Sequence, residues 1–289
     1  MEAWSLPIPL TLFLLVVEFF YARGWLRLQR TLLRPISFPQ FAAFTSGLLS
    51  VWIAIASPLA ILDHELLSIH MVQHILLMAV AAPLILLGEP TLPLLHGLPK
   101  LFDNGVLGPC LRCDPMRRVG RFVTQPIFCW IAATLTVIGW HVPAMFELGM
   151  HSHWWHAIQQ ISFFAAGLLF WWPVIQAFPS VSRWPRWSIP LYLFFATLPC
   201  DALSAFLTFC DRVVYRPYLL QHHHPFGISP LQDQEWAGVL MWVCITFIYM
   251  LPAVVITVRA LSPVNTYRSQ PRSAEEVLRR PNRWLNPTS

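Results

Sequence analysis

Long apolar runs separated by polar segments make up most of this chain. Each run has about 20 residues, the length that an α-helix needs to cross the hydrocarbon core of a bilayer. Several runs contain a proline, which membrane helices tolerate because neighbouring groups satisfy the carbonyl that it frees. The pattern predicts an all-α fold, a polytopic membrane protein built as a bundle of seven transmembrane helices. The predicted spans are residues 6–24, 41–59, 66–87, 122–143, 154–175, 188–210 and 237–259.

Basic residues alternate with these spans and predict the orientation of the bundle. Seventeen of the 19 Lys and Arg residues follow the first, third, fifth and seventh spans, and only Arg212 and Arg216 fall on the other side. Cytoplasmic loops of membrane proteins carry such an excess of Lys and Arg. We therefore expect the N-terminus outside and the C-terminus in the cytoplasm.

The same pattern predicts one transmembrane domain over residues 1–260 and a polar cytoplasmic tail over 261–289. The tail is rich in Arg and Pro, which favours low order. The first apolar run has no basic segment before it and no small-residue cleavage site after it. We interpret this run as a retained helix and not as a signal peptide.

Composition excludes several classes of function. The formal charge of +5 comes from the loop residues, and no arginine-rich arm with interleaved aromatics predicts nucleic-acid binding. The six cysteines are scattered and form no disulfide framework, and the CxxC pair Cys110 and Cys113 lacks the second pair of a zinc site. The chain has no HExxH, GxSxG or glycine-rich phosphate loop. We do not expect an enzyme.

Histidines are distributed opposite to the basic residues. Ten of the eleven lie on or near the predicted outer face, and only His96 lies on the cytoplasmic side. The ten are His64, His70, His74, His141, His151, His153, His156 and the His222–His224 triplet.

His70 and His74 are the most informative pair. They are four residues apart, so they share one face of the third span, and Met78 extends that stripe by another turn. At 1.5 Å per residue they lie roughly 6 Å and 12 Å below the outer boundary. Ionisable groups inside a membrane helix are costly and mark functional sites by default.

If the third, fourth and fifth spans are neighbours, His141 and His156 join this pair in one outward-opening pocket. Imidazole together with thioether suits copper, and thioether favours Cu(I). Met145 offers a further exchangeable thioether. The candidate metal ligands are His70, His74, His141, His156, Met71 and Met78.

Two carboxylates fall inside predicted spans, Glu18 and Asp201. A buried carboxylate needs a partner or stays protonated, which favours a structural role for both. Asp201 follows Pro199 and Cys200 at mid-depth, where it is a candidate for orienting a histidine beyond the ligand shell. Glu18 lies nearer the cytoplasmic end, within reach of loop arginines.

Four stretches resemble a known family in the same order. His70 to His74 with the following Ile-Leu-Leu, continuing through Ala82-Pro83 to Gly88-Glu-Pro90, resembles the signature helix of the CtaG family of cytochrome c oxidase assembly factors. These are seven-helix bacterial membrane proteins linked to copper insertion. The other three stretches are Trp140-His141-Val-Pro143, His156–Phe163 with Gly167–Pro173, and Ser229–Trp242 including Asp233-Gln234.

The resemblance covers roughly residues 40–260 and implies an assembly role at the bacterial cell (inner) membrane. The implied function is to bind Cu(I) at the periplasmic face and help insert it into the catalytic subunit of a haem–copper oxidase. That subunit is the implied partner, with a periplasmic copper carrier as a further candidate. The family usually has a second histidine where this chain has Gln160, so Gln160 is expected beyond the ligand shell. The Asp233-Gln234 pair is expected to cap the seventh helix, with lining the mouth of the pocket as the alternative.

Three alternatives stay open at this point. Membrane histidines on facing helices also ligate b-type haem. A copper transporter would use the same ligands but needs polar groups along the inner half too. A scaffold that binds oxidase subunits without binding metal would also be consistent with the family resemblance.

Overall fold

The computed structural model describes residues 6–31, 36–99, 114–175, 185, 187–220 and 225–262. Within these residues every regular element is a helix and none is a strand, so the predicted all-α class is confirmed. Outside the described residues lie residues 263–289 of the predicted 261–289 tail, Cys110, Cys113 and the His222–His224 triplet, whereas Leu261 still belongs to α15.

Six helical segments are long and apolar enough to cross a membrane. The third is continuous but contains a π-helix, η1 (Leu76–Ala81), between α4 (Leu67–Ile75) and α5 (Ala82–Leu87). The other five are α1 (Ile8–Thr31), α2 (Phe38–Ala56), α12 (His153–Ile175), α13 (Ser188–Phe209) and α15 (Pro230–Leu261).

The fourth predicted span is broken near its C-terminal end. Helix α10 (Pro126–His141) stops at His141, and α11 (Pro143–His151) leaves it at 78°. The break falls at Val142, which is extended (φ −64°, ψ 126°) because a residue before proline avoids the helical region. Counting this bent pair as one span raises the number of candidate spans to seven.

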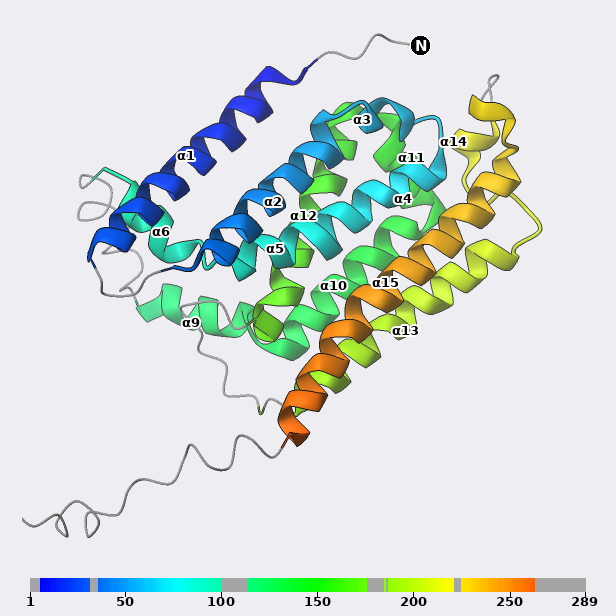
Figure 1. The fold of residues 1–289 in the computed structure, drawn as a ribbon. Coiled ribbons are helices and arrows are strands. Elements are labelled where there is room, and N and C mark those ends of the chain that lie inside the picture. Colours follow the sequence, from blue (N-terminus) through cyan, green and yellow to red (C-terminus); the bar gives the residue numbers. More distant parts are fainter. Residues whose placement is uncertain are drawn as a thin grey trace, which may run out of the picture.

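The third span forms the centre of the bundle (Figure 1). In its apolar 18-residue stretch 72% of the residues are buried, against at most 39% in any other span. Helix α15 packs on α4 and pairs with α13, whereas α12 packs on α5 and η1. Helix α1 lies at the edge of the bundle against α2 and α6 (Thr91–Gly97).

The π-helix is held by α12. A Cβ on Gly167 would lie only 2.7 Å from the Met78 carbonyl oxygen, so only glycine allows the two backbones to approach this closely. One turn further along α12, the indole Nε1 of Trp171 donates a hydrogen bond of 3.1 Å to that same carbonyl. Such π-bulges occur frequently at functional sites, and this one begins two residues after His74.

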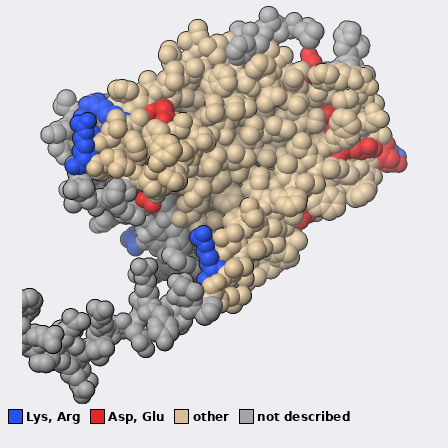
Figure 2. All heavy atoms as spheres, in the orientation of Figure 1, with Lys and Arg blue, Asp and Glu red and all other residues tan. Residues whose placement is uncertain are grey.

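Short helices cover the two ends of the bundle (Figure 1). Helices α6 and α9 (Asp114–Val123) lie at one end, and α3 (Leu59–Leu62), α11 and α14 (Arg216–Leu219) at the other. The 3₁₀ turn η3 (Pro225–Gly227) precedes α15. On the face in Figure 2, Lys and Arg side chains gather mainly at the α6 end and near the end of α15.

The close contact at Gly167 predicts that alanine destabilises the protein at this position but not at Gly139, a glycine without such a contact. Gly167→Ala forces Cβ into the Met78 backbone and should cost about 1–3 kcal/mol through overpacking. Gly139→Ala on α10 meets nothing within 4 Å and should be neutral or slightly stabilising. Apparent melting temperatures of the two variants in one detergent check this, and equal temperatures would contradict it.

Candidate metal centre

The N-terminus of α4 is fixed by a residue from the last helix. The carboxylate of Asp233 accepts hydrogen bonds from the backbone N–H of Leu67 (2.5 Å) and Ser68 (3.2 Å) and from the Ser68 hydroxyl (2.5 Å). The expectation that Asp233 caps its own helix is therefore wrong. Ser229 and Gln232 cap α15 as a capping box, which leaves the buried Asp233 free to cap α4.

The capped helix presents His70 and His74 on one face, as their spacing predicted. Their Nε2 atoms lie 2.9 Å apart, and both residues are buried. Their Nδ1 atoms are also buried and have no hydrogen-bond partner among the described residues. Two convergent imidazole nitrogens at this separation are well placed to share one proton or one metal ion.

His141, the last residue of α10, is held in one tautomer when neutral. Its Nδ1 lies 2.7 Å from the Val137 carbonyl oxygen, which can only accept, so Nδ1 carries the proton. The Nε2 lone pair then faces the Met71 sulfur at 3.4 Å. The Tyr215 hydroxyl donates to the His141 carbonyl at 3.2 Å and anchors the end of the helix. Two candidate ligands from different helices therefore meet side by side.

A second group forms around His156 on α12, nearer the end covered by α3. His156 Nε2 lies 3.3 Å from Asp63 Oδ2, and His156 Nδ1 lies 3.3 Å from His64 Nε2. The imidazoles of His70 and His156 lie close together, with ring centroids 5.5 Å apart. One ligand atom each from Asp63, His70 and His156 lie within 4.8 Å of one another.

Asp63 stands between α3 and α4 and is fully buried. Burial raises the pKa of its carboxyl to about 7, because the charged form loses its hydration. Burial also raises the pKa of the Tyr218 phenol, which donates to the Asp63 carbonyl at 2.7 Å. This backbone contact ties the turn that carries Asp63 to α14.

Gln160 and Asp201, both predicted beyond the ligand shell, differ in whether they contact a histidine. The Gln160 amide nitrogen lies 3.2 Å from His156 Nε2 and 3.4 Å from the Gln73 side-chain oxygen, so Gln160 does touch a candidate ligand. Asp201 on α13 accepts a hydrogen bond from Thr246 at 3.3 Å. No hydrogen bond or ion pair joins Asp201 to a histidine within the described part of the chain.

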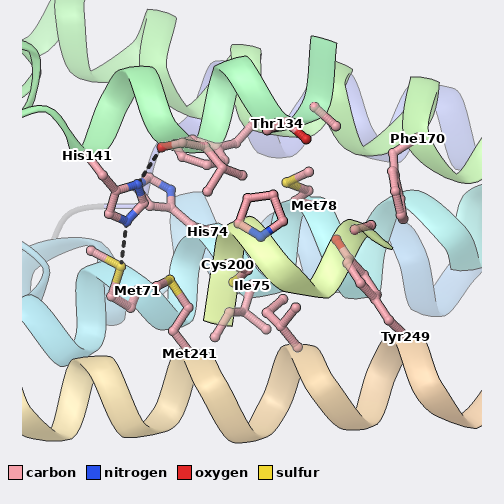
Figure 3. Close-up of a pocket in the computed structure, with 16 residues that line it drawn as sticks. Met71, His74, Ile75, Met78, Thr134, His141, Phe170, Cys200, Met241 and Tyr249 are labelled. Carbon is pink, nitrogen blue, oxygen red and sulfur yellow. Dashed lines mark hydrogen bonds between the residues drawn. The ribbon is translucent and has the colours of Figure 1, made fainter. Parts of the chain in front are cut away.

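A cavity of about 50 Å³ extends from this cluster into the bundle (Figure 3). His74 and His141 lie at one end, and the aromatic rings of Phe170 and Tyr249 form the other. Four sulfur-bearing side chains line the cavity, from α4, η1, α13 and α15. They are Met71, Met78, Cys200 and Met241.

All six predicted ligands therefore lie in or beside one buried region, but they divide into two groups. His74, His141, Met71 and Met78 line the cavity, whereas His156 faces Asp63. His70 joins the groups through its contacts with His74 and His156. Met145 on α11 is 46% exposed and does not line the cavity.

Sequence reasoning missed Asp63, Met241 and Cys200 as members of this region. Asp63 precedes His70 by seven residues, a spacing that would have placed both on one face had the helix continued. Met241 and Cys200 lie in apolar runs where nothing in the spacing distinguishes them from packing residues. His64 was predicted to lie at the outer face, and the structure brings it to within 3.3 Å of His156.

The fold and this region define a class, multi-pass helical membrane proteins with a buried polar pocket among their spans. Comparison with known families narrows the class. The family model of the cytochrome c oxidase caa3 assembly factors (Caa3_CtaG) matches residues 19–262. This chain belongs to that family, as its motifs predicted.

Similar chains occur in mycobacteria. Uncharacterized proteins of Mycobacterium bovis and Mycobacterium tuberculosis are each 27% identical over 231 residues, which cover 77% of this chain and 34% of theirs. One from Mycobacterium leprae is 24% identical over 250 residues, 84% of this chain and 36% of its own. The chain therefore spans about a third of the length of these relatives. No solved structure matches it.

The cap on α4 yields a testable expectation. Asp233→Ala leaves the first N–H groups of α4 without their acceptor and should cost about 2 kcal/mol. Glu235→Ala removes a carboxylate two residues away and serves as the control. Thermal unfolding in detergent measures both variants. Equal stability of the two variants would show that the cap contributes nothing.

Proposed function

We propose that this protein is an assembly factor for cytochrome c oxidase that binds Cu(I) and helps insert it into the oxidase. The cargo would pass to the copper centre of the haem–copper oxidase catalytic subunit, directly or through a soluble periplasmic copper carrier. Family membership supports the assembly role, which is non-catalytic. The observation that carries the copper part is the meeting of imidazole and thioether groups in one buried cavity.

The donor atoms fit Cu(I) better than a harder ion. Soft thioether ligands select Cu(I), and imidazole binds copper readily. The His141 Nε2 lone pair and the Met71 sulfur already face each other at 3.4 Å, and His74 lines the same cavity. In this proposal His70, His74, His141 and His156 supply nitrogen, and Met71 and Met78 supply exchangeable sulfur.

The proposed topology has seven spans, with the bent α10–α11 pair as the fourth. The N-terminus lies outside and the C-terminus in the cytoplasm of a bacterial inner membrane, so the histidine end faces the periplasm. The basic asymmetry of the loops supports this orientation. It agrees with the histidine cluster and the basic residues on α1 lying at opposite ends of the bundle.

Two rival functions fit the pocket less well. The 2.9 Å between the Nε2 atoms of His70 and His74 leaves no room for a haem iron between them. A copper transporter needs a path to the other side. Here Phe170 stacks on Tyr249 with ring centroids 4.9 Å apart, and these apolar rings bound the far end of the cavity.

A metal-free scaffold remains the main competing function, and metal analysis distinguishes it. The full chain, purified in detergent under anaerobic reducing conditions, should bind Cu(I) against a chromophoric Cu(I) chelator. Met71→Leu combined with Met78→Leu keeps the volume of the cavity nearly unchanged while removing both thioethers. This variant should bind Cu(I) more weakly. If the double variant bound Cu(I) as tightly as the unmodified protein does, the two thioethers would not be ligands.

The cellular test substitutes His70 and His74 together by alanine. The oxidase should lose activity and copper content, because the cavity loses the two imidazoles on its central helix. His96→Ala is the control, since His96 is an exposed histidine on α6 at the other end of the bundle. Normal oxidase activity and copper content in the double variant would refute the proposal.

A further inference from the structure

We propose that Asp63, His70 and His156 form a second metal subsite, specific for a divalent ion, beside the sulfur-lined cavity. The subsite lies in the pocket of the proposed Cu(I) function and deepens that proposal, but its own binding chemistry does not require Cu(I). It uses oxygen and nitrogen donors where the cavity uses sulfur and nitrogen. His70 and His156, which the Cu(I) proposal also uses, are shared between the two.

The Asp63 carboxylate is the observation that calls for a cation. It is fully buried, and its two oxygens lack a well-aligned hydrogen bond among the described residues, although the Gln73 side chain and the His64 backbone N–H lie near enough to lower its pKa. Carboxylates buried away from water are normally paired or bound to metal, because an uncompensated charge is very costly there. The groups near it that can carry a positive charge are imidazoles, at 3.3 Å for His156 Nε2 and 3.8 Å for His64 Nε2.

The backbone places this carboxylate firmly. The Asp63 N–H donates to the Leu59 carbonyl at 3.1 Å, and the Tyr218 hydroxyl donates to the Asp63 carbonyl at 2.7 Å. His70 follows on the helix that Asp233 caps. His156 therefore comes from α12, His70 from α4, and Asp63 from a turn whose backbone is hydrogen-bonded through both its N–H and its carbonyl. Such fixed donors give the rigid support that a metal site requires.

The donor set favours a divalent ion of borderline character. Two imidazoles and one carboxylate with an open position bind Zn²⁺ and similar ions with bonds of about 2.0–2.2 Å. Donor atoms within 4.8 Å of one another can converge on such an ion with small shifts. The Met71 thioether faces His141 instead.

His64 fits the role of the exchangeable fourth ligand. Its side chain is 50% exposed, whereas those of Asp63 and His156 are 0% and 8% exposed. It is therefore the only member of this group that reaches both solvent and the buried donors. An ion arriving from outside would meet His64 before the others.

The competing explanation is that Asp63 only orients His156. A carboxylate paired with a ligating histidine does this in many metal sites, and losing it costs about 10–100-fold in affinity. A direct ligand should cost more. The experiment must therefore separate ligation from orientation.

Co(II) is a suitable probe, because its visible spectrum reports the ligands. Purified full-length protein in detergent, titrated with Co(II) alone, should give d–d bands typical of four or five ligands. Asp63→Asn should weaken Co(II) binding by more than about 100-fold while leaving anaerobic Cu(I) binding in place. Glu65→Gln removes a carboxylate from the same turn and should bind Co(II) as the unmodified protein does.

Asp63→Cys gives a readout that orientation alone cannot produce. A thiolate bound to Co(II) adds an intense near-ultraviolet charge-transfer band, which appears only if residue 63 is a ligand. Absence of that band in a folded, Co(II)-binding variant would overturn the ligand assignment. So would failure of the unmodified protein to bind Co(II).

These outcomes separate the subsite from the proposed function. Cu(I) binding without Co(II) binding would overturn the subsite and leave the copper function standing. Co(II) binding at residue 63 without Cu(I) binding would overturn the copper function and leave the subsite standing.

Discussion

The structure depends on satisfying polar side chains in the dry centre of a membrane bundle. The third span carries two histidines and Gln73, all buried, where an unpaired polar group is costly. Neighbouring side chains meet this requirement in part, and the Nδ1 atoms of both histidines have no hydrogen-bond partner among the described residues. Phe163 stacks on His74 with ring centroids 3.9 Å apart, and Gln160 reaches Gln73. Both of these contacts come from α12, which packs along this span.

Much of the fold could be predicted from the sequence, because the length of an apolar run is a local property. The third span was predicted at 66–87 and lies at 67–87. Three other boundaries were less accurate. The first helix continues to Thr31 and does not end at residue 24. The last helix starts at Pro230 and not at 237, because a Ser-Pro capping box extends it beyond the apolar run. The fourth breaks before Pro143, which hydropathy does not register.

The candidate site could be predicted only in part. The imidazoles of His70 and His74 converge because they share a helix face, which spacing alone indicates. Asp63 could not be found in this way, because the turn between α3 and α4 decides where its side chain lies. Contacts between residues far apart in the chain were equally inaccessible. The cap of Asp233 on α4 joins residues 166 positions apart.

That long-range cap has a consequence for biosynthesis. A chain is made and inserted from its N-terminus, so the histidine helix enters the membrane well before α15 does. Until α15 follows, the N-terminal end of α4 lacks the carboxylate that binds its first N–H groups. The pocket is therefore completed by the last transmembrane helix, and a nascent chain held before that point would carry the histidines without their final geometry.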